Sequence, residues 1–349
     1  MGQSMAYKRS NGKLQRRKIE PAVQTIILST PVTGAGTTGS YYCDLSQIAS
    51  IVNRRFYRQG INWMVSGMKF ITAVDSSIIV RKLPNTWVMR NAWVKSFSAW
   101  QKMNENALAE AESVKPRFLD FKIFADKDHH LIGSGDNLLP VTYDLDQVPG
   151  AQIIPATPGE WEMSKFVVPK TDGTDGVNNF EIVAVGSNYP GSGASGLQAV
   201  SLIEGYAASR ALPNVLDPNA PDDAFDADGP TPENWQSALF NEGTSQDDAV
   251  LTDMVNENNL APYPFENDGI HTDTQYPGGA NQMDQLEVHD LLTVSSTTIG
   301  GMTHSKGGQF PCGLIRFDHT TGDTAGNLVI QIDLVPGTHR GYLCEPMGA

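Results

Sequence analysis

Short runs of apolar and β-branched residues, several of them alternating with polar ones, recur near both ends of this 349-residue chain and predict β-strands. Residues 117–126 alternate most cleanly, with phenylalanine on both sides of the pattern. We expect residues 77–83 to pair with residues 61–74. The full set of predicted strands comprises residues 22–30, 61–74, 77–83, 117–126, 137–145, 161–169, 178–186, 285–297, 311–320 and 327–337.

Helical periodicity is strongest over residues 91–113, where large apolar residues recur at steps of three and four. These aromatic side chains could stack on nucleobases, but a buried core face is the expected role. Residues 44–55 predict a shorter helix that Asp44 can cap. Further helices are predicted over residues 197–212, 233–243 and 247–259. The apolar face of the long helix consists of Trp93, Phe97, Trp100, Ala107, Leu108 and Ala111.

The order of these elements predicts the fold class. Strands lie on both flanks of a helix-and-loop segment, about residues 187–282, and they do not alternate with helices as in a parallel α/β sheet. The 33 glycines and 21 prolines favour a loop-rich fold with many turns. We therefore predict a mainly β protein: residues 21–349 form a single antiparallel jelly-roll sandwich with large helix-and-loop insertions.

Charge is distributed unevenly along the chain. The whole sequence has 25 basic and 39 acidic residues, a net charge of −14. Residues 1–20 hold six basic residues and one acid, whereas residues 131–349 hold six basic residues and thirty acids. We predict that residues 1–20 form a basic arm of disordered type. Its basic residues are Lys8, Arg9, Lys13, Arg16, Arg17 and Lys18.

This polarity indicates a protein with two differently charged sides. A basic arm suits a polyanion, and nucleic acid is the commonest one. Arg54, Arg55 and Arg58 follow the predicted capped helix and are candidates to extend the basic surface. The alternatives are that the arm is a solubilising or targeting tail and that the three arginines are simply solvated.

Motifs for catalysis or metal binding are few. The chain has no phosphate-binding glycine loop, no H-E-x-x-H and no G-x-S-x-G. Residues 126–130 (DKDHH) read as a solvated polar turn, with metal binding as the minor alternative. Asp226 and Asp228 resemble part of a calcium loop, but Ala224 and Trp235 occupy its essential end positions. A loose Ca²⁺ site between subunits is the most that this pattern supports, and we expect no cofactor.

Three cysteines are too few for a disulfide framework, so we expect free and mostly buried thiols. No apolar run is long enough to cross a membrane, and no signal-peptide core opens the sequence. An acidic β-rich hydrolase acting on carbohydrate through two carboxylates remains an alternative, as does a sugar-binding module. No carboxylate pair is singled out by its context.

Two strings resemble a known family. Residues 83–126 (LPNTWVMRNAWVKSFSAWQKMN…ESVKPRFLDFKIFAD) are similar to capsid proteins of small circular, Rep-encoding single-stranded DNA (CRESS-DNA) viruses, especially environmental and circovirus-like ones. Residues 201–243 (SLIEGYAASRALPNVLDPNAPDD…ENWQSALFNEG) resemble the same family. Together the strings cover about a quarter of the chain.

The resemblance implies a structural protein without catalytic activity. Copies of one jelly roll would tile an icosahedral shell, of 60 copies or alternatively 180, with the basic arm turned inward to a single-stranded DNA genome. The expected location is the virion, after assembly in the host nucleus or cytoplasm, without a membrane. Many relatives carry a longer arginine-rich arm, so the three arginines after the capped helix, or solution cations, are expected to assist.

Overall fold

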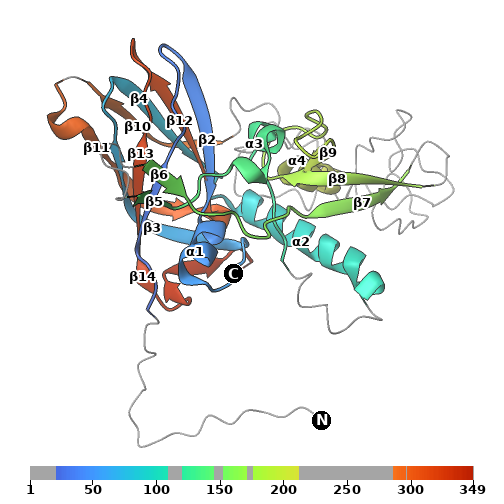
Figure 1. Ribbon diagram of the computed structural model, residues 1–349. Coiled ribbons are helices and arrows are strands. Elements are labelled where there is room, and N and C mark those ends of the chain that lie inside the picture. The colour runs from blue at the N-terminus through green and yellow to red at the C-terminus, as the bar shows by residue number, and fades with distance from the viewer. Residues whose placement is uncertain are drawn as a thin grey trace, which may run out of the picture.

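The computed structural model describes residues 21–108, 120–144, 152–170, 176–211, 286–295 and 297–348. Within them the chain is mainly β and is built on two antiparallel sheets, which occupy one side of the molecule in Figure 1. Sheet one has the order β1 (Thr25–Ser29), β13 (Val329–Leu334), β3 (Ile61–Ile71) and β11 (Met302–Phe310), with β16 (Cys344–Pro346) also paired to β3. Sheet two has the order β10 (Glu287–Val294), β4 (Ser76–Lys82), β12 (Leu314–Thr321) and β2 (Thr38–Asp44).

The two sheets share one apolar core. Buried and half-buried positions alternate along β13, so Ile330 and Ile332 point inward, as the period of two in a strand requires. From the facing sheet, the ring of Phe317 lies 5.9 Å from that of Phe70, and both are fully buried. Inward residues of β1, β3, β4 and β12 complete the cluster, so the sandwich is held together by side chains from both inner faces.

The sequence located most of these strands but not all of their partners. The prediction that residues 77–83 pair with residues 61–74 is wrong, because β4 pairs with β10 and β12 in the other sheet. Strands β2 and β11 were not predicted. Strand β11 is rich in glycine and polar residues and lies at the edge of sheet one, where only one neighbour supports it.

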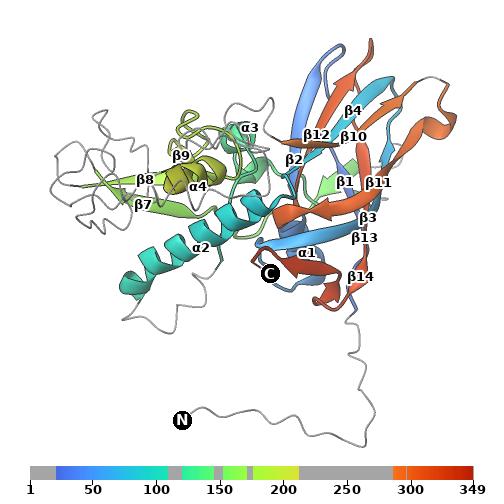
Figure 2. The ribbon, with the colours of Figure 1, turned by 180° about the vertical axis from the view of Figure 1, so that it is seen from behind.

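A long connection, residues 83–286, joins β4 to β10 and contains almost all of the remaining elements. In both views (Figures 1 and 2) its residues 87–108, 165–169 and 177–211 extend away from the sandwich, whereas residues 141–144 and 152–155 lie beside β1. Its elements are α2 (Trp87–Leu108), α3 (Lys127–Ile132), η2 (Ser134–Asp136), β5 (Val141–Asp144), β6 (Gln152–Pro155), β7 (Lys165–Pro169), β8 (Val177–Val183), β9 (Gln198–Ser201) and α4 (Leu202–Ala211). The short elements η3 (Ile299–Gly301), η4 (Pro311–Gly313), β14 (Pro336–Gly337) and β15 (Gly341–Tyr342) lie outside it.

The predicted insertion, residues 187–282, falls inside this connection. Its first predicted helix begins at Leu202, because the preceding residues form β9, which pairs in parallel with β8. The helices predicted over residues 233–243 and 247–259 lie outside the described residues. None of the described helices is both long and apolar enough to span a membrane.

The connection packs in a second apolar cluster, to which Tyr42 and Leu314 of sheet two also contribute. Trp93 and Trp100 of α2 are buried, and their rings lie 5.9 and 5.6 Å from that of Phe121. This confirms that the aromatic side of α2 is a packing face. Residues from β7, β8 and α4 complete the core: Phe166, Val168, Phe180, Ile182, Ile203, Tyr206 and Ala207.

The strand predicted over residues 117–126 is not formed by its described part. Residues 120–126 make a single bridge, between Phe124 and Val183. The backbone of Ile123 is hydrogen-bonded to a side chain instead of to a strand. The Ile123 amide donates to Gln59 Oε1 at 2.7 Å, and Gln59 Nε2 donates to the Ile123 carbonyl at 3.0 Å. A buried glutamine side chain thus replaces the neighbouring strand.

Helix α1 (Leu45–Asn53) confirms the predicted cap. The Asp44 carboxylate accepts a hydrogen bond from the Ser46 amide at 2.8 Å, which satisfies one of the free amides of the first turn. The other carboxylate oxygen accepts from Gln59 and Trp161. This capping residue therefore also ties α1 to the connection.

Residues 126–130 are not the solvated turn that the sequence predicted. Asp126 caps α3 by accepting from the His129 amide at 2.9 Å, and both His129 and His130 are buried. The cause is a partner far away in the sequence: Arg316 of β12 donates to Asp126 at 2.9 Å and to Asp128 at 2.8 Å. The same guanidinium donates to Asp318 at 2.8 Å on the outer face of sheet two.

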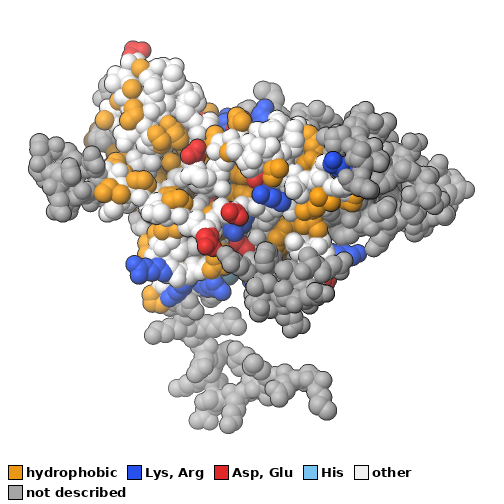
Figure 3. All heavy atoms as spheres, turned by 45° about the vertical axis from the view of Figure 1, so that its right-hand side comes forward, with side chains coloured by type: hydrophobic (Ala, Val, Ile, Leu, Met, Phe, Trp, Pro, Cys, Tyr) orange, Lys and Arg blue, Asp and Glu red, His pale blue; other side chains and the backbone are white. Residues whose placement is uncertain are grey.

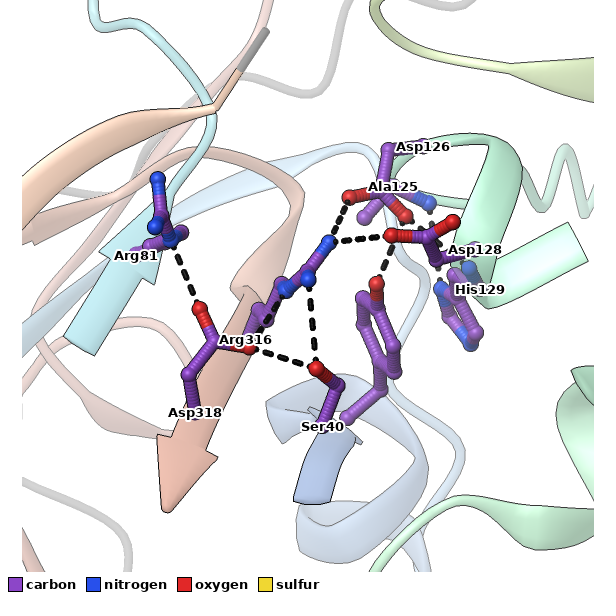
Figure 4. A network of polar contacts seen from close by, with 9 residues as sticks. Ser40, Arg81, Ala125, Asp126, Asp128, His129, Arg316 and Asp318 are labelled. Atoms are coloured by element: carbon purple, nitrogen blue, oxygen red, sulfur yellow. Dashed lines mark hydrogen bonds and ion pairs between the residues drawn. The ribbon is translucent and has the colours of Figure 1, made fainter. Parts of the chain in front are cut away.

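Figure 4 shows these contacts as one network. Tyr42 donates to Asp126 at 2.8 Å, and Ser40 and Arg81 donate to Asp318, each at 2.7 Å. The Asp126 and Asp318 side chains are only 3% and 6% exposed. Asp126 therefore depends on Arg316 for charge compensation, whereas Asp318 shares this cation and also pairs with Arg81.

We predict that Arg316→Met lowers the free energy of unfolding by about 3 kcal/mol, because it leaves both carboxylates buried without their shared cation. Denaturant unfolding measures this. The control is Arg90→Met, which breaks an ion pair to Glu345 whose two side chains are 26% and 57% exposed. That substitution should cost less than about 1 kcal/mol. Equal losses in the two variants would show that the network carries no stability.

A second prediction concerns pH. Burial lowers the pKa of His129 to about 4, and its Nδ1 accepts from the Ala125 amide at 3.1 Å, which also requires the unprotonated ring. The unfolded chain takes up this proton near pH 6.5, so folding stability is complete above that value and falls as the pH drops toward 4. The loss from His129 is about 3 kcal/mol over this range.

His129→Asn places an amide oxygen near the position of Nδ1 and does not titrate. Between pH 6.5 and 4 its free energy of unfolding should fall less steeply with pH than that of the wild type. The difference in slope should correspond to about one fewer proton taken up on unfolding. His304→Asn, at an exposed histidine, is the control and should keep the wild-type slope. Identical slopes in all three proteins would contradict the prediction.

Candidate nucleic-acid interface

Three of the arginines singled out from the sequence lie at the C-terminal end of α1. Arg54 ends the helix in the left-handed conformation, with φ of 51° and ψ of 36°. Arg54 and Arg58 are exposed, and Arg55 is partly buried. Because the last carbonyls of a helix carry partial negative charge, cations are favourable at this end.

The described chain begins beside this helix end. The Val23 amide donates to Asn53 Oδ1 at 2.9 Å, and Tyr342 donates its hydroxyl to the Val23 carbonyl at 2.6 Å. The first described residues, 21–23, are thus fixed next to Arg54. The six basic residues predicted to bind nucleic acid in the arm, Lys8, Arg9, Lys13, Arg16, Arg17 and Lys18, lie outside the described residues.

The structure adds Arg340 and His339 to this end of the molecule. Tyr57 donates its hydroxyl to the Arg340 carbonyl at 2.9 Å, and Arg340 donates to the Phe56 carbonyl. The two segments are 283 residues apart in sequence. Sequence analysis had no local signal for Arg340, because a lone arginine near the C-terminus shows nothing of its neighbours.

We refer to Arg54, Arg55, Arg58 and Arg340 as the basic end. Figure 3 shows Lys and Arg side chains gathered at the lower left of the described surface. His339 contributes no charge at neutral pH, since burial and the neighbouring Arg340 both lower its pKa. The nearby Asp120 is mostly buried and ion-paired with Lys122, so its charge is largely compensated.

A cavity of about 470 Å³ opens between the basic end and the aromatic face of α2. Its walls combine the Arg58 and Arg340 side chains with aromatic rings. The rings belong to Phe56, Tyr57, Trp93, Phe97 and Phe121. Phe56 is 46% exposed, which is unusual for so large an apolar side chain.

A second cavity, of about 410 Å³, lies in the connection and is lined by Asp136, Glu162 and Glu181. His130 and Ser195 both hydrogen-bond to Glu181 Oε2, at 2.9 and 2.8 Å. Burial alone would raise the pKa of Glu181, but these two bonds lower it below its usual value. The serine contacts the carboxylate rather than the histidine, so this is not the arrangement of a Ser-His-acid triad.

The weak calcium candidates Asp226 and Asp228 lie outside the described residues. In the part of the chain that the structure describes, no three His, Cys, Asp or Glu side chains are grouped to hold a metal ion. Cys43, Cys312 and Cys344 are free thiols, and the first two are buried, as predicted.

The geometry at the basic end can hold phosphate by charge and flat rings by stacking. It contains no arrangement of a nucleophile with a base. Comparison of the chain with protein-family models, with curated proteins and with solved structures gives no match.

Proposed function

We propose that this protein is the coat protein of a small circular single-stranded DNA virus. Its copies assemble into a closed icosahedral shell, and its basic arm packages the genome. The observation that carries the proposal is the position of the basic end. Four arginines lie near the start of the described chain, and the basic residues of positions 1–20 come directly before that point in the sequence.

We further propose that the sandwich is a jelly roll, and the strand pairing supports this. Apart from the short β16, which pairs with β3, the sandwich has eight strands: in chain order β1, β2, β3, β4, β10, β11, β12 and β13. The first pairs with the last, the second with the seventh, the third with the sixth, and the fourth with the fifth. That is the pattern of one long hairpin.

The other two pairs, β13 with β3 and β12 with β4, are those that form when such a hairpin is rolled into two sheets. Jelly rolls occur in viral capsids, and also in lectins and cupins. The fold therefore fits a coat protein without deciding the function, which depends on the charged surface.

The acidic residues of the chain suit the outer side of a shell, opposite the basic end. Residues 131–349 carry thirty acidic and six basic residues, and acidic loops on the outside would leave the basic end for the interior. Apolar side chains away from the basic end are available for contacts between copies. Ile299 is 95% exposed, Val32 70% and Leu291 62%. A shell of 60 copies repeats these contacts by symmetry, and 180 copies are the alternative.

In this proposal the protein has no catalytic role and no cofactor. A Ca²⁺ ion bound at the contacts between subunits is the alternative to having no cofactor. The arm and the basic end hold phosphates without reading bases. The protein would be found in the virion and, during assembly, in the host nucleus or cytoplasm.

Electron microscopy of the purified full chain tests the assembly. We expect closed particles of uniform diameter and a megadalton species in gel filtration. A compact monomer in every buffer would contradict a coat protein. If that monomer also cleaved or bound carbohydrate, the alternative of a hydrolase or sugar-binding module would replace it.

Deleting residues 1–20 should leave the sandwich folded but remove most DNA from the particles, because six of the positive charges leave with them. The ratio of absorbance at nucleic-acid and protein wavelengths measures the DNA content. With six contacts, log affinity for a single strand should fall with log salt at a slope of roughly −4 for the intact arm. Unchanged DNA content after deletion would argue against packaging by the arm.

Phosphate contacts at Arg54 and Arg58 would steepen the slope of the full chain beyond the roughly −4 of the arm alone, by about 0.7 for each contact. The double variant Arg54→Gln and Arg58→Gln should therefore reduce the magnitude of the full-chain slope by about 1.4. The matched control neutralises Lys69 and Lys306, which lie on β3 and β11 away from the basic end. That control should keep the wild-type slope. Equal slopes for both double variants would exclude the arginines from the interface.

A further inference from the structure

We propose that the cavity between the basic end and α2 holds one nucleotide of a bound single strand, with the base against the aromatic rings and the phosphate on Arg58 and Arg340. This inference rests on the proposed function and adds to it a defined binding site on the folded surface.

The aromatic walls give a base a surface to stack on. The rings of Trp93 and Phe97 are stacked on each other, with centroids 4.9 Å apart and an angle of 21° between their planes, so no base enters between them and they form the inner wall of the cavity. Phe56 stands at the cavity with nearly half of its surface exposed. Every base has a flat π face, so such walls bind single strands with little preference for sequence.

The walls are held in place before any ligand enters. A side-chain carbon added at Gly60 would lie 2.2 Å from Cζ2 of Trp93, so the indole lies directly on this backbone segment and its orientation is fixed. Trp93 is only 7% exposed, and its indole nitrogen has no hydrogen-bond partner among the described residues.

Charge selects this cavity over the other hollows of the described surface. Its lining includes two arginines and no carboxylate. The cavity in the connection is lined by three carboxylates and Lys165, and a larger hollow, of about 1010 Å³, is lined by Asp120, Glu160 and Glu162 together with Lys122 and Lys165. Phosphate would be repelled by those carboxylates and attracted by the arginines. A volume of about 470 Å³ lies within the range of roughly 300–1,000 Å³ typical of small-ligand sites.

The cavity also lies close to the start of the described chain. Tyr342, which holds Val23, packs its ring 5.5 Å from that of Tyr57, and Tyr57 lines the cavity. The start of the described chain and the cavity are therefore joined by a short chain of contacts.

The test is binding of a short fluorescent oligothymidylate to the full chain, measured by anisotropy. Phe56→Ala should weaken binding about tenfold, as expected for the loss of one stacking contact. An abasic oligonucleotide of the same length should bind the wild type and Phe56→Ala equally, since it offers only phosphate. Ile299→Ala, which removes a more exposed apolar side chain far from the cavity, is the matched control and should bind like the wild type.

Arg58→Gln keeps the aromatic walls and should weaken binding of the abasic and the thymidylate oligomers alike. Because Phe56 and Arg58 are both exposed, near-wild-type thermal unfolding of the variants is expected and checks their fold. The inference is overturned if Phe56→Ala binds oligothymidylate as tightly as the wild type, or if it loses the same factor on the abasic oligomer.

These outcomes are separate from those of the proposed function. If deletion of residues 1–20 empties the particles while Phe56→Ala binds normally, the cavity site is wrong and the coat protein stands. If no particles form while Phe56→Ala loses only base-dependent binding, the nucleotide site stands and the coat protein does not.

Discussion

The arrangement of this protein depends on one partly buried cation. Arg316 extends from the outer face of sheet two, where a strand would ordinarily meet water, and joins Asp318 of its own strand to Asp126 and Asp128 of the connection. A buried ion pair of this kind contributes little net stability, but it cannot be separated without leaving charges unpaired. The contact therefore fixes where the connection lies on the sandwich, and with it the position of α2 relative to the basic end.

The second constraint is the pairing of strands from opposite ends of the chain. Because β1 pairs with β13, the N-terminal segment lies beside the C-terminal one, and Tyr342 can hold Val23 while Tyr57 holds Arg340. Charge that is scattered in the sequence thereby becomes one surface. The cavity forms where this surface meets the aromatic face of α2.

Local patterns predicted what depends on local physics. The Asp44 cap, the strands with strong β-branched character and the buried aromatic face of α2 were all readable, since period and capping act over a few residues. The sequence did not predict the pairing of β4, the burial of His129 or the position of Arg340. Each of these depends on a contact with a segment more than a hundred residues away. The basic arm and the calcium candidates remain predictions, as they lie outside the described residues.

The long connection between β4 and β10 has a consequence for how the chain finds its fold. Two neighbouring strands must meet after roughly two hundred intervening residues, and such distant contacts slow folding. The entropy lost on closing a loop grows only logarithmically with its length, so the thermodynamic penalty is modest. The second apolar cluster contains both Leu83 and Leu286, the first and last residues of the connection. Early collapse of this cluster would bring the adjoining Lys82 and Glu287 close together and so shorten the loop that the sandwich has to close.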